Sequence, residues 1–332
     1  MKLDRRSVLG GLGSAAALGL SPRAALAQGI SIDMGTHDVG TTWYQYGVLL
    51  SQYIKKGMPA GSVVNVRPYA AAEGNLLLIE ANDRIQIGMT FSTNVAWARA
   101  GLSDITKATA GNVRLLAAGL DQYYVGMSAL RSKGYGTVTN AIGSGGVRIT
   151  TGPAGSLGAQ ATGLILQAHG LDEGKVGAQG GSVTRTGVAA ASEAAVTGRA
   201  DVWINPISLG HPRMTELALS NDVEILELAD GPMAELTKLG FVPARLPAGS
   251  FNGQTEDKTL PGMSTALIAN AALDDDTAYM VTKALLDNIE QIKSENASMK
   301  VMAPKTMADV AVGGGAELHP GAARAYREAG VI

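Results

Sequence analysis

The feature that most constrains the fold is residues 30–47, where the patterns of a strand, a glycine loop and a helix follow one another. Residues 30–34 alternate apolar and polar side chains, which is typical of a strand. Gly35 and Gly40 bracket a polar loop, and residues 43–55 have helical spacing. Such a loop can bind an anion, because the N–H groups of the first helical turn have no partners within the helix. It can equally be a tight turn in which glycine supplies a positive φ.

Two further strands of the first half end in the same way. The strand predicted at 63–67 leads into the polar loop 69–75, and the strand at 85–90 leads into 91–94 ahead of a helix. In an open parallel α/β sheet these loops lie together at the carboxyl edge, where ligands bind. The repetition favours a ligand site over three unrelated turns.

A second unit of the same kind follows. A strand at 147–151 enters the glycine loop 152–158 and a helix at 159–169, and a strand at 200–205 has a polar end. The chain has 332 residues, more than one core usually supports. We therefore predict two α/β lobes. Lobe I comprises residues 28–122 plus 262–332, and lobe II comprises residues 123–261.

Composition excludes several classes of function. The chain has no cysteine, which excludes disulfides, thiolate metal sites and cysteine nucleophiles. Its four histidines have no metal-ligand spacing, so we expect neither a metal nor another cofactor. The formal net charge is −2 and no basic cluster occurs, so we expect no nucleic-acid partner.

The N-terminus has the pattern of an export signal. Lys2, Arg5 and Arg6 precede an apolar segment at 8–20, and Ala25-Leu26-Ala27 matches a cleavage site. The Arg5-Arg6-Ser-Val-Leu run resembles a twin-arginine signal, and a general secretory signal is the alternative. The segment is shorter than the ~20 apolar residues of a membrane span. We predict that residues 1–27 are removed and that the exported protein has no membrane anchor.

Four stretches resemble the periplasmic solute receptors of TRAP transporters in the TAXI class. They are the loop at 35–44, the segment at 73–88, the loop at 152–156 and, most specifically, the segment at 318–330 with Leu-His-Pro-Gly-Ala followed by Arg, Tyr, Glu and Gly. Together they extend over nearly the whole predicted mature chain, in the order of the family. The chain departs from the pattern at His37-Asp38-Val39, where small hydroxyl residues and glycine are usual, and at Ala71 and Ala72, where the family is more polar.

This resemblance implies a type II-like periplasmic-binding-protein fold. Each lobe would be a mostly parallel sheet flanked by helices, and hinge strands would cross between the lobes. The lobes would close on a small organic anion or amino acid, glutamate-like or 2-oxoacid-like, and deliver it in the periplasm to the membrane permease subunits of a TRAP transporter. The departures at residues 37–39 and 71–72 affect the expected ligand and not the fold.

The candidate ligand-binding residues come from loops 36–44, 69–75 and 90–94 of lobe I and from loops 151–156 and 203–206 of lobe II. In these loops His37 could donate to a ligand carboxylate, and Asp38 and Glu73 would suit a ligand ammonium or simply cap their helices. The full set is Thr36, His37, Asp38, Thr41, Thr42, Trp43, Tyr44, Tyr69, Glu73, Asn75, Ser92, Thr93, Thr151, Ala154, Gly155, Ser156 and Asn205.

Other functions remain open at this point. Ala154-Gly-Ser-Leu-Gly158 nearly matches the nucleophile elbow of serine hydrolases, with Ser156 as nucleophile and His319 downstream. That reading requires a histidine within hydrogen-bond reach of the Ser156 hydroxyl. A receptor of this kind can also report ligand occupancy to a membrane sensor, or serve an ATP-driven importer. We expect a binding protein and not an enzyme.

Overall fold

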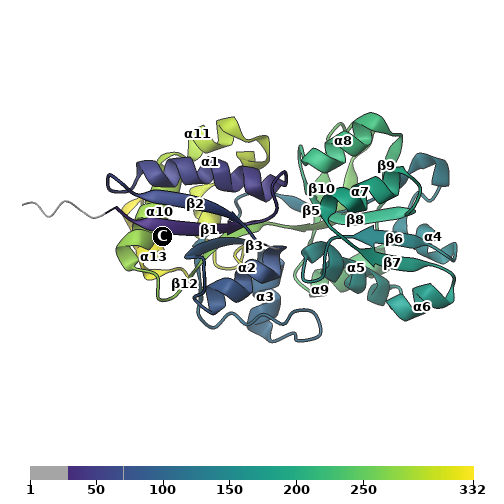
Figure 1. Cartoon of the computed structure of the whole chain (residues 1–332), viewed down its shortest axis with the longest axis horizontal. Helices are drawn as coiled ribbons and strands as arrows, with labels where there is room; N and C mark the ends of the chain where they lie inside the picture. The colour runs from purple at the N-terminus through teal and green to yellow at the C-terminus, as the bar shows by residue number, and fades with distance from the viewer. Residues whose placement is uncertain (1–28, 70) are drawn as a thin grey trace, which may run out of the picture.

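The protein consists of two α/β lobes joined by crossing strands (Figure 1). The structure is a computed structural model and describes residues 29–69 and 71–332. The predicted export signal at 1–27 lies outside the described residues. Across the part of the chain that the structure describes, no helix has the length and apolar character needed to cross a membrane.

The first sheet, in lobe I, has the strand order β2-β1-β3-β12-β4. Its strands are β1 (Ser31–Thr36), β2 (Val63–Pro68), β3 (Ile87–Phe91), β4 (Val113–Ala117) and β12 (Thr265–Asn270). Around it lie α1 (Thr42–Lys56), α2 (Ala71–Glu80), α3 (Ser92–Ala100), α10 (Asp275–Asp287), α11 (Ile289–Glu295), the 3₁₀ turn η2 (Ala297–Val301), α12 (Pro304–Met307) and α13 (Pro320–Glu328).

The second sheet, in lobe II, has the order β10-β11-β5-β8-β6-β7, and β9 also pairs with β5. Its strands are β5 (Tyr123–Leu130), β6 (Arg148–Thr151), β7 (Ser182–Arg185), β8 (Val202–Ser208), β9 (Val223–Ile225), β10 (Val242–Leu246) and β11 (Lys258–Met263). Its helices are η1 (Arg131–Lys133), α4 (Val138–Gly143), α5 (Leu157–Ala168), α6 (Glu173–Ala178), α7 (Val188–Val196), α8 (Pro212–Ser220) and α9 (Asp230–Lys238).

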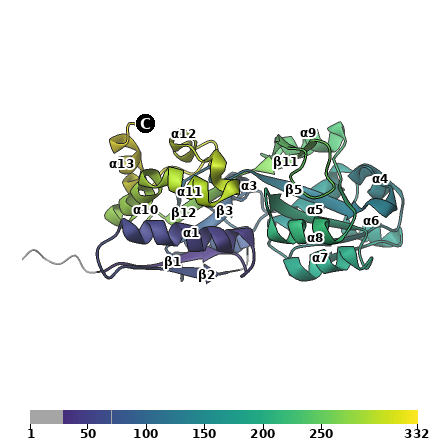
Figure 2. The same cartoon turned by 90° about the horizontal axis from the view of Figure 1, so that it is seen from above.

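The two-lobed α/β prediction is confirmed, and the sheets are mixed where we expected them to be mostly parallel. The parallel part of lobe I is β2-β1-β3, and that of lobe II is β7-β6-β8. In each lobe, a strand that enters from the other lobe lies beside the parallel part and is antiparallel to its neighbours. This strand is β12 in lobe I and β5 in lobe II. The lobes therefore repeat one arrangement. Figure 2 shows them side by side, with α1, β1, β2 and β3 in lobe I and α5, α7 and α8 in lobe II.

The central strands explain the apolar runs in the sequence. Every residue of β3 and β12 is buried, because helices cover both faces of these inner strands. One local prediction is wrong. Helix α2 begins at residue 71, so Glu73 and Asn75 belong to a helix and not to a loop.

The chain crosses between the sheets twice, after Ala117 and at Ser264. β11 ends at Met263, two residues beyond the boundary expected at 261. The Asp121 carboxylate joins the two crossings, because it accepts hydrogen bonds from the Thr265 N–H (2.9 Å) and the Thr265 hydroxyl (3.0 Å). Burial raises the pKa of Asp121 to about 7, against the lowering effect of these hydrogen bonds.

This hinge carboxyl predicts a pH-dependent stability. The folded-state pKa is raised above the unfolded value, so the folded state holds the proton more tightly and loses stability as pH rises toward 7. Asp121→Asn keeps the shape and removes the ionisation. Between pH 5 and pH 8 the unfolding free energy of wild type should fall by about 2–3 kcal/mol relative to that of Asp121→Asn.

Urea unfolding of both proteins at several pH values measures this difference, with the exposed Asp104→Asn as control. Parallel curves for wild type and Asp121→Asn would show that the hinge carboxyl does not titrate in this range.

Candidate functional site

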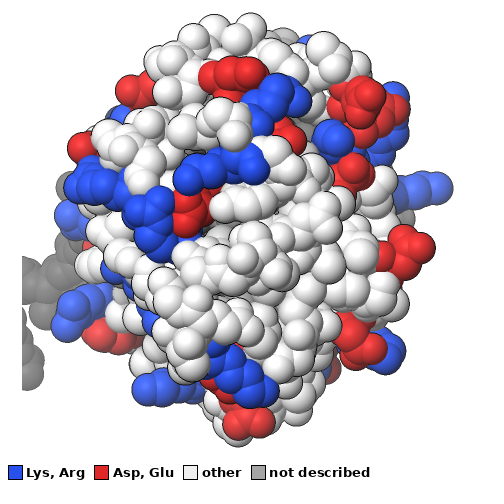
Figure 3. Space-filling model, turned by 90° about the vertical axis from the view of Figure 1, so that its right-hand side faces the viewer, with Lys and Arg blue, Asp and Glu red and all other residues white. Residues whose placement is uncertain are grey.

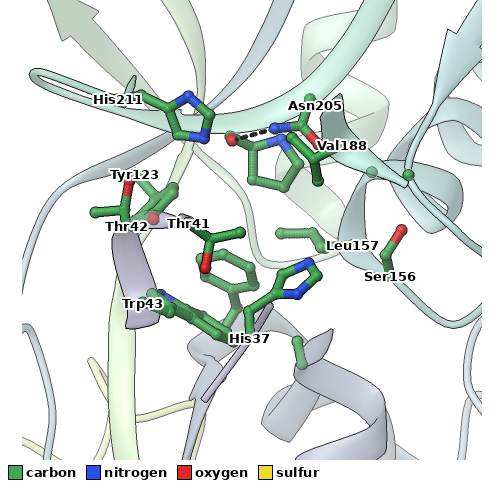
Figure 4. Close-up of a pocket in the computed structure, with 15 residues that line it drawn as sticks. His37, Thr41, Thr42, Trp43, Tyr123, Ser156, Leu157, Val188, Asn205 and His211 are labelled. Atoms are coloured by element: carbon green, nitrogen blue, oxygen red, sulfur yellow. Dashed lines mark hydrogen bonds between the residues drawn. The ribbon is translucent and has the colours of Figure 1, made fainter. Parts of the chain in front are cut away.

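A cavity lies between the lobes, at the carboxyl edges of both sheets (Figure 4). It has an empty volume of about 470 Å³, part of which is open to solvent, and fifteen residues line it.

Equivalent loops of the two lobes form the cavity. The loops after β1 and β6 contribute His37 and Thr41 on one side and Gly152 and Ser156 on the other. Ala72 and Val188 come from the starts of the helices after β2 and β7. The end of β3 contributes Phe91, and the middle of β8 contributes Asn205 and Pro206. Glycine is required where the first pair of loops turns, since Gly40 (φ 86°) and Gly155 (φ 78°) adopt the left-handed conformation.

Six helices begin at this cavity, α2 and α3 among them, because Ala72 lies in the first turn of α2 and Phe91 is the N-cap residue of α3. Thr41, Ser156 and His211 line it and are the N-cap residues of α1, α5 and α8, and α7 begins at Val188. The side chains of these caps accept hydrogen bonds from Tyr44, Ala159 and Met214 N–H groups. Helices α1, α5, α7 and α8 have no acidic residue in the first turn, whereas α2 has Glu73 there and α10 has two acidic residues. The partial positive charges of four helix ends therefore face one cavity, and Glu73 of α2, which lies outside the lining, has its carboxylate bonded to Thr106, Lys107 and Gln160 instead.

The lining contains no formal charge. None of the fifteen described residues that surround the cavity is Asp, Glu, Lys or Arg. The polar groups are hydroxyls, one amide and two imidazoles. An anion would therefore meet neutral donors and helix N-termini and no carboxylate, an arrangement that favours negative charge.

Two histidines, one from each lobe, face the cavity as neutral rings. His37 Nδ1 accepts the Asp38 N–H (2.6 Å) and His211 Nδ1 accepts the Met214 N–H (3.3 Å). Since each Nδ1 is an acceptor, the proton of each neutral ring resides on Nε2. Burial lowers the pKa of both; that of His211 is about 4, depressed further by His37 and Arg213, and for His37 the Asp38 charge opposes the shift. The rings are thus hydrogen-bond donors without positive charge near neutral pH.

Aromatic side chains form the apolar wall of the cavity. The ring of Phe91 lies 4.4 Å from that of Trp43 and 5.0 Å from that of Tyr123, measured between centroids. The Trp43 indole N–H donates to the Thr265 hydroxyl (2.9 Å), which in turn donates to Asp121. The cavity wall is therefore hydrogen-bonded directly to the hinge.

Six predicted residues line the cavity, namely His37, Thr41, Thr42, Trp43, Ser156 and Asn205. The Thr42 hydroxyl is buried beside the Tyr123 hydroxyl, and among the described residues it has no partner within hydrogen-bond geometry. Buried hydroxyls are normally satisfied, so this one suits a ligand.

The structure places the other predicted residues outside the cavity lining. Thr36 and Asn75 are buried and bond to backbone carbonyls, which fixes the loop after β1. The Asp38 side chain is 62% exposed, and Glu73 faces an outer groove together with Ala154 and Gly155. Thr93 and Thr151 are buried beside the lining, and Ser92 accepts from the Ser264 N–H at the hinge. Tyr44 and Tyr69 are half-buried away from it.

Sequence reasoning missed nine lining residues. These are Ala72, Phe91, Tyr123, Gly152, Leu157, Gly158, Val188, Pro206 and His211. His211 precedes Pro212, and a capping residue before proline is a helix-start signal that could have identified it. Tyr123 belongs to a crossing strand, and no local pattern indicates that it reaches the cavity.

Ser156 lacks the geometry of a hydrolase nucleophile. Its hydroxyl accepts the Ala159 N–H (3.3 Å) as a helix cap, and no hydrogen bond among the described residues joins it to a histidine. His319 is buried in lobe I, where it caps α13 and lies beside Asp275. The triad that the sequence order allowed is not assembled.

Comparison with known proteins gives one family. The model of the NMT1-like family matches residues 34–330, most of the chain.

Solved structures share the fold. MatC from Rhodopseudomonas palustris, determined with bound malate, is similar at 13% identity and a TM-score of 0.56, over 83% of this chain and 90% of that chain. PhnD1 from Prochlorococcus marinus, in complex with methylphosphonate, is similar at 12% identity and a TM-score of 0.50, over 81% of this chain and 87% of that chain. A protein from Bordetella bronchiseptica RB50 reaches 15% identity and a TM-score of 0.50, over 90% and 88%. The fold is that of the periplasmic binding proteins.

The unpartnered hydroxyl of Thr42 gives a test of the cavity in the absence of ligand. Thr42→Val has the same shape and removes a buried polar group that the protein leaves unsatisfied. Its unfolding free energy should equal that of wild type or exceed it by about 1 kcal/mol.

The matched control is Thr36→Val, because the Thr36 hydroxyl is also buried but contacts the carbonyl oxygens of His37 and Arg67. This variant should lose about 1 kcal/mol or more. Chemical denaturation compares the two, and an equal loss in both variants would contradict the assignment of Thr42 to a ligand.

Proposed function

The chain belongs to the NMT1-like family, and from this membership and its cavity we propose that it is a solute receptor that closes over a small organic anion. The observation that supports this most is the convergence of four helix N-termini on a cavity lined by no charged side chain. Helix N-termini and neutral N–H and O–H donors bind carboxylates without an arginine or a metal.

The same lining favours a carboxylate that has no ammonium group. An amino acid would bring a positive charge to a cavity without Asp or Glu, against four positive helix ends. The two acids expected to bind an ammonium, Asp38 and Glu73, face solvent and an outer groove. A 2-oxoacid or a related acid with an apolar body fits the aromatic wall. Malate and methylphosphonate, the ligands of MatC and PhnD1, are also anions without an ammonium.

We further propose a role in transport. The signal pattern of residues 1–27 supports export, by the twin-arginine or the general route. The resemblance of four stretches to TAXI-class receptors supports delivery of the ligand in the periplasm to TRAP permease subunits. At the end of lobe II, charged residues of both signs lie mostly toward the rim, around a central area without charge (Figure 3). Sensing for a membrane receptor would use the same closed form.

The moving units of this mechanism are the two lobes, residues 28–122 plus 262–332 and residues 123–261, with the hinge at Asp121 and Thr265. Ligand shifts the population toward the closed form, because only that form brings the helix ends of both lobes to one anion. Binding, and not catalysis, is the proposed activity, since Ser156 acts as a helix cap.

Matched pairs of ligands test the proposal. The protein is unfolded, freed of ligand and refolded, then titrated calorimetrically with 2-oxoglutarate and glutamate, and with 4-methyl-2-oxopentanoate and leucine. We expect the oxoacid of at least one pair to bind, and to bind at least about tenfold more tightly than its amino acid, which corresponds to about 1.4 kcal/mol.

Tighter binding of the amino acid in both pairs would contradict the absence of an ammonium site. No binding by any of the four compounds would remove the 2-oxoacid assignment. Hydrolysis of a generic ester that Ser156→Ala abolishes would overturn the receptor assignment.

A further inference from the structure

One side chain of lobe II reaches across to lobe I beside the cavity. Gln160, in the first turns of α5, donates from Nε2 to Glu73 Oε2 (3.2 Å) and to the Ile105 carbonyl oxygen (3.0 Å). Its Oε1 accepts from Asn94 Nδ2 (2.8 Å). Both ends of one amide are therefore hydrogen-bonded to the opposite lobe.

Lobe I holds the partners of this amide in place. Glu73 Oε1 accepts from the Thr106 hydroxyl (2.9 Å) and the Lys107 N–H (2.6 Å), which orients Oε2 toward Gln160. Asn94 is fully buried and Glu73 is 7% exposed. The carboxylate and the amide of lobe I thus form a fixed receptor for one glutamine side chain.

These partners are adjacent in sequence to the cavity lining. Ala72 lines the cavity and Glu73 follows it, Phe91 lines it and Asn94 is three residues on, and Leu157 lines it and Gln160 is three residues on. The elements that contact a ligand in the cavity therefore also bring the Gln160 contacts together.

Other contacts between the lobes differ in character. The Trp97 indole N–H donates to the Leu239 carbonyl oxygen (2.7 Å), and its ring packs on Phe241, with both rings buried. Gln160 is half-buried at the edge of the outer groove, so water can replace its partners when the lobes separate. The amide contacts can break and reform at low cost.

We propose that Gln160 is a positioning residue that latches the two lobes in the closed form, through Glu73, Asn94 and the Ile105 carbonyl, without touching the ligand. This rests on the proposed function in that closure serves ligand capture. The latch sets the ratio of closed to open protein and thereby the rate of ligand release. It also explains why Glu73 is not a ligand contact, because three donors already engage its carboxylate.

The chain has no cysteine, so two spin labels can be placed without background. Gln52→Cys on α1 and Ala190→Cys on α7 are both exposed, one on each lobe. Pulsed electron paramagnetic resonance measures the distance between the two labels in the refolded protein. The doubly labelled protein is compared with the same protein carrying Gln160→Ala. Each is measured without ligand and with 2-oxoglutarate or 4-methyl-2-oxopentanoate. Gln167→Ala is the control, because Gln167 is an exposed glutamine of the same helix.

Gln160→Ala should lower the ratio of short to long distances about tenfold and raise the dissociation constant of a bound acid by a similar factor, through faster release. Gln167→Ala should match wild type. In a double-mutant cycle, Asn94→Ala should change the ratio of short to long distances less in the Gln160→Ala background than in wild type.

Distances and affinity in Gln160→Ala within twofold of wild type would overturn the latch, as would a wild type that shows only long distances under all conditions. If no acid binds but Gln160→Ala still shifts the distances, the latch stands and the ligand class of the proposed function falls. The two failures are thereby distinguished.

Discussion

The structure depends on a set of helix N-termini that meet between two lobes. Helices α1, α5, α7 and α8 begin at one cavity, and none of them has an acidic side chain in its first turn. The first-turn N–H groups that the caps leave unpaired cost free energy unless water or an anion accepts their hydrogen bonds. Closing the lobes removes water, so the closed form requires a ligand that replaces it. Solute capture follows from this constraint.

The hinge and the cavity form one hydrogen-bonded unit. Trp43 lines the cavity and donates to Thr265, and Thr265 donates to the buried Asp121 at the first crossing. An anion in the cavity lies against the same aromatic wall behind which this carboxyl is buried. Two negative charges near one low-dielectric wall disfavour each other, so ligand binding and the protonation of Asp121 should be linked. His37 and His211 are neutral, so they can donate hydrogen bonds to an anion and need no counter-ion when the cavity is empty.

Much of the architecture could be predicted from local patterns. Gly40 and Gly155 indicate the loops after β1 and β6 in the sequence. These loops contain His37, Thr41 and Ser156, and Thr42 follows the first of them. Glu73 could not be placed, because the start of α2 at residue 71 turns its carboxylate toward the outer groove. Tyr123 comes from a crossing strand whose position depends on long-range pairing with β8 and β11. Side chains that reach the site through tertiary contacts have no sequence period to indicate them.

The most direct test of the account is a crystal structure of the refolded protein with a bound 2-oxoacid. The account predicts that carboxylate oxygens lie within hydrogen-bond distance of first-turn N–H groups of α1 and α5, with His37 or His211 Nε2 as a further donor and no arginine or lysine at the anion. An acid bound in the outer groove, or paired with a basic side chain, would contradict it.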